Sequence, residues 1–194
     1  MFDTLIRGGA VVDGTGRPAF AADVAVSSGR IAAIGDLSAA SAAHVIDAAG
    51  RTVTPGFIDI HRHADAALFR PGFGAAELCQ GLTTIVNGNC GLSAAPFGPA
   101  HGDAIRDYLR PITGALPPEL VTETLSGYFA SVPNIPVHVG MLAGAGVLRA
   151  DAATWRTATT APCTAPWSRL WPTARWAFLW AWVTPRSASI PRRS

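Results

Sequence analysis

Short apolar runs separated by glycine-containing turns make up the first 55 residues of the chain. The runs flank three turns: Thr4–Ile6 and Ala10–Val12 flank Gly8-Gly9, Asp23–Val26 and Ile31–Ile34 flank Ser27–Arg30, and His44–Ile46 and Thr52–Val53 flank Ala48–Arg51. Two strand-like runs on either side of such a turn predict a β-hairpin. Their repetition predicts a small β-sandwich piece over residues 1–55, with a small barrel or an irregular meander as the alternatives.

The pattern changes after Pro55-Gly56, where short buried strands alternate with helix-like segments. Strands are predicted at Phe57–Ile60, Thr83–Val86 and Ile135–Leu142, and helices at residues 74–80, 103–109 and 122–130. A strand–helix alternation of this kind is typical of βαβ units that build a parallel sheet. Residues 56–150 are therefore expected to form an α/β domain.

The last 44 residues, 151–194, differ in composition from everything before them. All six tryptophans lie after residue 154, whereas all twenty glycines lie before residue 147. The first 150 residues carry nine arginines and twelve acids, and the last 44 carry six arginines and one acid. Three interpretations are open: an aromatic basic segment at a membrane interface, an RNA- or membrane-binding tail, or a segment translated out of frame.

The genetic code bears on the third interpretation because tryptophan has a single codon. Read in a frame displaced by one base, the codons that join Trp176–Ala177, Trp180–Ala181 and Trp182–Val183 become glycine whatever the codon choice. The displaced frame gives a glycine-punctuated apolar strand like those of the first 150 residues. We therefore expect residues 151–194 to be a frame-shifted, non-native tail, without function and prone to aggregation.

Charge, lysine content and cysteine content exclude several classes of function. The net charge of +2 gives no basic field for nucleic acid. No apolar run reaches the roughly 18 residues of a membrane span. Lysine is absent, which excludes Schiff-base, P-loop and carbamylated-lysine chemistry. With too few cysteines for a disulfide scaffold and no secretory signal, we expect a cytoplasmic protein without nucleic-acid or membrane partners.

Two histidines and a cysteine follow consecutive predicted strands and are the candidate metal ligands. His61 and His63 end the first strand, and their spacing of two residues places both imidazoles on one face. Cys90 follows the next strand, within a glycine-rich turn. Imidazole and thiolate donors suit zinc, while surface histidines and a small buried cysteine are the alternatives. Asp65 either orients a ligand or contacts substrate, or it is a solvated loop acid.

The other histidines and cysteines receive no role in the chemistry. Cys79 is expected in the core as part of a helix, and His138 in the core or at its rim. His44 and His101 are expected at the surface, and Cys163 lies in the tail.

Three segments carry a resemblance to a known family. Pro55–Asp65, which reads Pro-Gly-Phe-Ile-Asp-Ile-His-Arg-His-Ala-Asp, resembles the first metal motif of the amidohydrolase superfamily. Asn87–Ser93 resembles the cysteine motif of one branch, the N-acyl-D-amino-acid deacylases or D-aminoacylases. Gly29–Gly35 is typical of the β-sandwich part of the superfamily, and the resemblance covers about residues 1–150.

This resemblance implies a metal-dependent TIM-barrel hydrolase beside a β-sandwich, with zinc at the carboxyl ends of the strands. His61, His63 and Cys90 would be the metal ligands and Asp65 a substrate-binding residue. The general base would be a carboxylate from a later strand, so no catalytic residue is assigned. Ala145 departs from the family pattern, in which a histidine is usual. Residues 56–150 suffice for about three of the eight strands of a barrel that takes about 250 residues.

The sequence thus predicts a zinc-dependent amide hydrolase that converts N-acyl-D-amino acids to a carboxylate and a D-amino acid. This chain is expected to be a truncated and inactive part of it. One alternative is another amidohydrolase that acts on cyclic or linear amides. The other is a non-enzymatic fragment with an Arg/Trp-rich binding tail.

Overall fold

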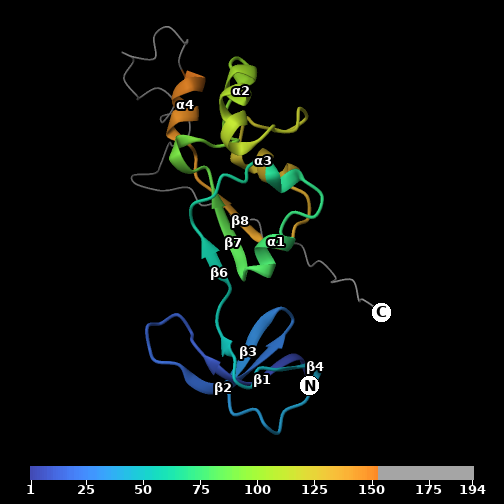
Figure 1. Cartoon of the computed structure of the whole chain (residues 1–194). Coiled ribbons are helices and arrows are strands. Elements are labelled where there is room, and N and C mark those ends of the chain that lie inside the picture. The colour runs from blue at the N-terminus through green and yellow to red at the C-terminus, as the bar shows by residue number, and fades with distance from the viewer. Residues whose placement is uncertain (153–194) are drawn as a thin grey trace, which may run out of the picture. The chain divides into compact units, whose positions relative to one another are not determined.

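The structure is a computed structural model, and it describes residues 1–152 of the chain. The chain divides into two compact units, the first comprising Met1–Gly56 and the second beginning at Phe57 (Figure 1). Apart from its first two residues, the predicted frame-shifted tail lies outside the described residues. None of the described helices is long and apolar enough to cross a membrane.

The first unit is a single five-stranded sheet. Its strands are β1 (Phe2–Val11), β2 (Phe20–Ser27), β3 (Arg30–Gly35), β4 (Ala42–Asp47) and β5 (Thr52–Val53). The order is β3-β2-β1-β4, and β5 also pairs with β1. β2 runs antiparallel to β1 and β3, whereas β4 and β5 run parallel to β1. The described residues of this unit thus form one sheet layer, and the sandwich stays a prediction.

The predicted turns of this unit have different outcomes. The turn at Ser27–Arg30 is confirmed, because β2 and β3 pair around Ser28 and Gly29, whose φ angles are 51° and 71°. The prediction of a hairpin at Gly8-Gly9 is wrong, because β1 continues through both residues. The register of β1 against β2 shifts there, as in a β-bulge. The hairpin at Ala48–Arg51 is wrong as well, because the strands on either side both pair with β1 instead of with each other.

The second unit contains a three-stranded parallel sheet with helices in the connections, which confirms the predicted α/β class. The strands, in the order β6-β7-β8, are β6 (Phe57–Asp59), β7 (Leu82–Asn87) and β8 (His138–Met141). The helices are α1 (Ala75–Cys79), α2 (Gly102–Thr113), α3 (Leu125–Ser131) and α4 (Ala145–Ala152). Two short 3-10 turns, η1 (Ala67–Phe69) and η2 (Asn89–Gly91), complete the unit. Helix α4 was not predicted, and a closed barrel stays a prediction.

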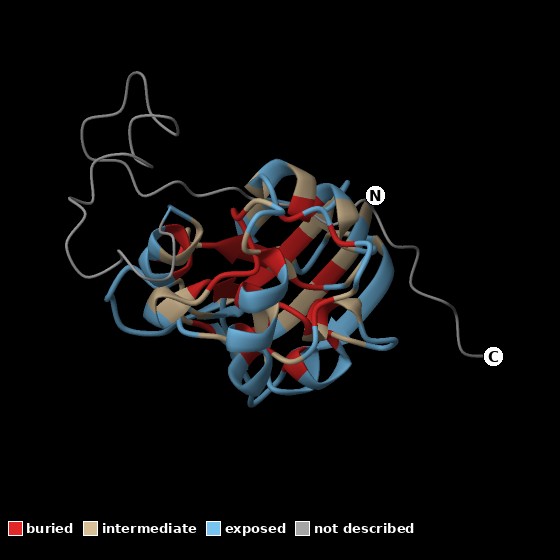
Figure 2. Cartoon of the chain, turned by 90° about the horizontal axis from the view of Figure 1, so that it is seen from above, coloured by how far each residue is buried: buried red, intermediate tan, exposed pale blue. Residues whose placement is uncertain are grey.

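One apolar core holds the second unit together. Its buried members include Ile85 of β7, Val139 of β8, Leu109 of α2 and Tyr128 of α3. Figure 2 shows buried residues on the strands and on the inward faces of the helices. Because β6 and β7 run parallel, the segments that follow these strands leave the sheet at the same end, the carboxyl end.

Candidate metal centre

The segment after β6 turns sharply and exposes two imidazoles. The backbone N–H of His61 donates to Asp59 Oδ1 at 3.1 Å, which ends the strand with an Asx turn. The N–H of Arg62 then donates to Val86 O at 3.0 Å and keeps the segment beside β7. The rings of His61 and His63 lie on the same side, with centroids 5.5 Å apart.

The segment after β7 presents Cys90 from a strained turn. Gly88 has φ +78°, and Cys90 itself has φ 56° and ψ 20°, the left-handed region that non-glycine residues rarely adopt. A Cβ atom at residue 88 would lie 2.0 Å from Leu142 O, so only glycine fits this close approach. The turn directs the Cys90 thiol toward the two imidazoles.

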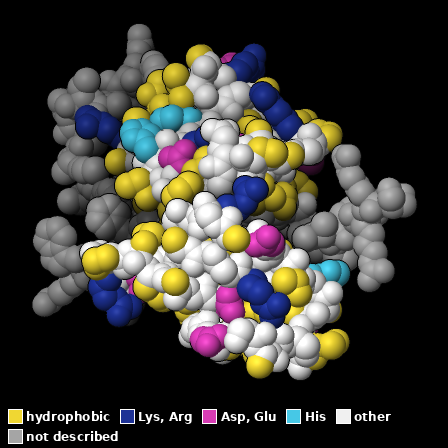
Figure 3. Space-filling model, turned by 60° about the horizontal axis from the view of Figure 1, so that its bottom comes forward, with side chains coloured by type: hydrophobic (Ala, Val, Ile, Leu, Met, Phe, Trp, Pro, Cys, Tyr) yellow, Lys and Arg dark blue, Asp and Glu magenta, His cyan; other side chains and the backbone are white. Residues whose placement is uncertain are grey.

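The structure brings three of the predicted site residues together. His61, His63 and Cys90 each offer one ligand atom, and these atoms all lie within 4.8 Å of one another. His61 Nε2 and Cys90 Sγ are 3.2 Å apart. Figure 3 shows histidine side chains gathered at the surface, in keeping with the exposure of His61. Two ring nitrogens and one thiol at this spacing can hold a transition metal ion.

His63 carries a further indication that the cluster is incomplete by itself. Its Nδ1 atom is buried, and among the described residues it has no hydrogen-bond partner. Buried polar atoms in folded proteins are nearly always paired, because an unpaired one loses its hydration without compensation. A ligand at the centre of the cluster would remove part of this cost, and so the donor set fits a metal.

Asp65 lies inside the protein and not at the surface of the site. Its exposed fraction is 0%, and its Oδ1 accepts from the N–H of Ala94 at 3.1 Å. Burial raises the pKa of Asp65 to about 6, and the backbone N–H groups of Ala94 and Gly88 partly oppose this rise. The hydroxyl of Tyr128 donates to the carbonyl oxygen of Asp65 at 2.8 Å. The predicted contact between Asp65 and substrate stays a prediction.

Two asparagines beside Cys90 were missed by sequence reasoning. Asn89 Nδ2 donates to Val86 O at 2.8 Å and to Arg62 O at 3.4 Å. Asn87 Oδ1 accepts from the N–H of Ala64 at 3.1 Å. The sequence shows both asparagines around a glycine-rich turn. No sequence pattern indicates that their amides would bond to the segment that carries His61 and His63.

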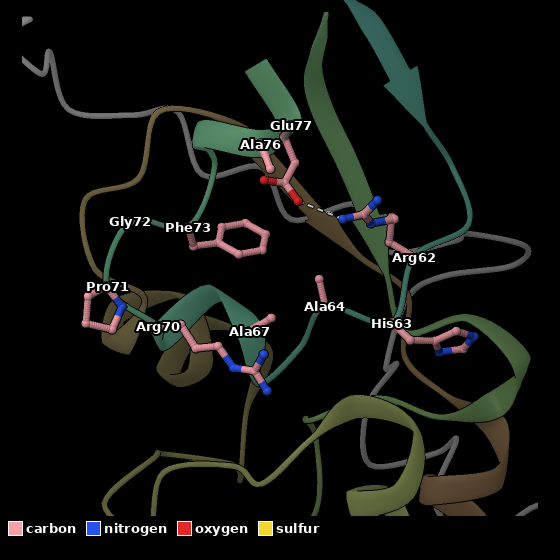
Figure 4. A pocket seen from close by; sticks show the side chains of 10 residues that line it. All are labelled: Arg62, His63, Ala64, Ala67, Arg70, Pro71, Gly72, Phe73, Ala76 and Glu77. Atoms are coloured by element: carbon pink, nitrogen blue, oxygen red, sulfur yellow. Dashed lines mark hydrogen bonds and ion pairs between the residues drawn. The ribbon is translucent and has the colours of Figure 1, made fainter. Parts of the chain in front are cut away.

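An open cleft of about 500 Å³ lies beside His63. In Figure 4, Arg62 turns toward Glu77, which lies on α1, whereas His63 points the other way. The Arg62 guanidinium contacts the Glu77 carboxylate at 2.7 Å. This ion pair occupies one wall of the cleft and leaves Arg70 on the opposite wall.

The other predicted positions are partly wrong. Cys79 is exposed, because α1 turns Glu77 inward to meet Arg62 and leaves Cys79 on the solvent side. His44 is exposed as predicted, and His138 is half-buried at the start of β8. His101 is half-buried too, which still leaves it at the surface, and its Nδ1 lies 3.1 Å from the carbonyl oxygen of Asp151.

Two curated proteins are similar in sequence to this chain. D-aminoacylase of Alcaligenes xylosoxydans xylosoxydans is 47% identical over 108 residues, which are 56% of this chain and 22% of that protein. N-acyl-D-glutamate deacylase of the same organism is 53% identical over 95 residues, 48% of this chain and 19% of that protein. The chain thus spans about a fifth of the length of these curated relatives.

A solved structure and a family model extend the match. The N-acyl-D-glutamate deacylase of Bordetella bronchiseptica, solved with zinc and a phosphonate inhibitor, superposes with a TM-score of 0.68 at 36% identity. That superposition covers 86% of this chain and 34% of the other. The model of the amidohydrolase family matches residues 44–191, well over half of the sequence. The chain therefore belongs to the amidohydrolase family.

Proposed function

We propose that this chain is part of a zinc-dependent amide hydrolase and supplies three of its metal ligands, His61, His63 and Cys90. The observation that carries the proposal is the convergence of these three side chains within 4.8 Å after adjacent parallel strands. Active sites of α/β proteins lie at the carboxyl ends of the parallel strands, where these three residues are found. Imidazole nitrogens and a thiolate sulfur favour zinc over the cations that bind mainly to oxygen ligands.

The residues of the chain have distinct parts in this proposal. Zinc bound here would polarise an amide carbonyl and promote ionisation of a water molecule. His61, His63 and Cys90 would hold the metal. A cysteine in this place agrees with the absence of lysine, because a carbamylated lysine cannot serve as a ligand here. The general base is proposed to be a carboxylate of a later strand.

The proposed substrates are N-acyl-D-amino acids, cleaved to a carboxylate and a D-amino acid. The support is the identity of 47% and 53% to proteins named D-aminoacylase and N-acyl-D-glutamate deacylase. The cleft with Arg70 on one wall has no part in this proposal, because the His63 ring points away from it (Figure 4).

We further propose that these 194 residues do not catalyse hydrolysis by themselves, because the described residues supply only three parallel strands of the second unit where a TIM barrel has eight. β6 lies at an edge of the described sheet, and its apolar residues Phe57 and Ile58 are 58% and 59% exposed. Residues 151–194 are proposed to be frame-shifted, on the codon argument. Since the family match includes most of this stretch, the frame needs a direct test.

The experiment combines a metal titration with a hydrolysis assay. We expect the purified chain to bind one zinc ion and to release no amino acid from a panel of N-acetyl-D-amino acids. Resequencing the DNA across codons 149–170 and beyond tests the reading frame, and the frame-corrected protein should hydrolyse the D but not the L substrates. Hydrolysis by the present chain would refute the proposed inactivity. A frame-corrected protein that is active without zinc would refute the metal centre.

A further inference from the structure

We propose that Asn87 and Asn89 are positioning residues for the metal centre. Their side-chain amides fasten the histidine-bearing segment to the Cys90 turn, and this fastening sets the metal affinity. The inference rests on the proposed function, because it takes His61, His63 and Cys90 as ligands.

Asn89 connects the two ligand segments through one amide group. Its Nδ2 atom donates to Val86 O at 2.8 Å, at the end of β7, and to Arg62 O at 3.4 Å. Arg62 is the residue between the two histidines, and Asn89 immediately precedes Cys90. One side chain therefore links the residue between the two imidazoles to the residue before the thiol.

Asn87 fastens the other end of the histidine segment. Its side chain is fully buried, and its Oδ1 accepts from the N–H of Ala64, the residue after His63. The backbone N–H of Arg62 also donates to Val86 O, ahead of the two asparagine contacts along the histidine segment. The histidine segment is thus held at three points by the end of β7 and the turn that follows it.

The conformation of Cys90 explains why such fastening matters. A residue with a side chain is unfavourable at φ 56°, and this geometry persists only where neighbouring contacts impose it. The hydrogen bonds of the Asn89 side chain hold this residue in place directly before Cys90. The Cys90 thiol lies 3.2 Å from His61 Nε2. If the Asn89 amide is lost, Cys90 can relax to an ordinary conformation and carry its sulfur away from the imidazoles.

The test is a cobalt titration of the full chain and of Asn89→Asp. The aspartate has the same shape, but it offers an oxygen where Asn89 donates to two carbonyl oxygens. Cobalt absorption reports metal affinity, and the thiolate charge-transfer band reports whether Cys90 is a ligand. We expect Asn89→Asp to bind cobalt at least tenfold more weakly, the order of loss seen when groups that support metal ligands are removed. Asn134→Asp is the matched control, because Asn134 is an exposed loop asparagine of the same unit.

A second variant and a double mutant separate positioning from loss of fold. Asn89→Ala removes the donor without adding charge, and it should also weaken binding while the far-UV circular dichroism stays unchanged. In a Cys90→Ala background, Asn89→Asp should change the cobalt affinity much less, because the residue that it positions is gone.

Three results would overturn the inference. Cobalt affinity unchanged in both Asn89 variants would show that the amide does not set the site. An equal loss with and without Cys90 would show that Asn89 acts through overall stability. Failure of the unchanged chain to bind cobalt or zinc would refute the proposed function together with this inference, whereas the first two results leave the proposed function intact.

Discussion

Gly88 lies close to the backbone of Leu142, the residue that follows β8. Replacing Gly88 by alanine tests whether this close packing stabilises the second unit. Gly88 has φ +78°, and an added Cβ would lie 2.0 Å from Leu142 O and 2.9 Å from Leu142 C. Both are backbone atoms, so no side chain can swing aside. Gly72 is the matched control, because it also has φ +78° but a Cβ there would meet nothing within 4 Å.

The two glycines separate the cost of backbone strain from the cost of contact. An alanine in the left-handed region costs about 1–2 kcal/mol. About 0.4–1 kcal/mol of this is offset, because alanine reduces the conformational freedom of the unfolded chain. Gly72→Ala should therefore destabilise the unit by roughly 1 kcal/mol. Gly88→Ala adds the displacement of the Leu142 carbonyl, comparable to overpacking at about 1–3 kcal/mol, for a total of about 2–4 kcal/mol.

Urea unfolding followed by far-UV circular dichroism measures both variants. The free energy of unfolding follows from the midpoint and the slope of each transition, with the unchanged chain as reference. A total near 2–4 kcal/mol would be a large part of the roughly 5–15 kcal/mol that stabilises an ordinary domain. Equal unfolding free energies for Gly88→Ala and Gly72→Ala would refute the reasoning, because they would show that the contact with Leu142 costs nothing.

Three further predictions concern the surroundings of the site. Tyr128→Phe leaves a buried carbonyl oxygen without its 2.8 Å donor, and it should lower the free energy of urea unfolding by about 1–2 kcal/mol. Arg62→Ala removes the partner of Glu77, whose exposed fraction is only 7%, and it should cost about 1–3 kcal/mol in the same assay. Arg62→Met would recover little of this loss if the charge is what matters, whereas full recovery would contradict the ion-pair argument. Cys90→Ser should reduce zinc affinity at least tenfold. Cys79→Ser changes the other described thiol and should leave the zinc affinity unchanged. Equal zinc affinities for both variants would exclude Cys90 as a ligand.

Local patterns predicted the elements of the chain better than their pairing. The turn at Ser28-Gly29 was found because its two residues themselves carry the positive φ angles of a tight hairpin. Glycine at residue 8 serves a bulge as readily as a turn, and what decides between them is the partner strand β2. The parallel pairing of β4 with β1 joins residues about forty apart, and no local signal announces it.

The convergence of His61, His63 and Cys90 agrees with what strand spacing and the resemblance to the amidohydrolase motifs together predicted. His61 and His63 share a face by the two-residue period, and Cys90 lies at the end of the neighbouring strand. The hydrogen bonds of Asn89 to Arg62 O and of Tyr128 to Asp65 O were not predicted, since both join residues far apart in sequence. Cys79 was misplaced because hydrophobicity favours burial, whereas the ion pair of Glu77 with Arg62 decided which face of α1 turns inward.

The close spacing of the ligand segments along the chain has a consequence for biosynthesis. His61 and Cys90 are 29 residues apart, because His61 follows β6 and Cys90 follows β7, with α1 between the two strands. A ribosome that adds about 5–20 residues per second would synthesise that stretch within a few seconds. A metal ion captured at that stage closes the loop between residues 61 and 90. The entropy cost of closing a loop rises by about 0.6 kcal/mol with each doubling of its length, so this short loop costs less to close than a long one. The nascent polypeptide thus holds a three-donor set as soon as β7 and its turn have left the exit tunnel, and ion capture would become an early step of folding instead of the last step of assembly.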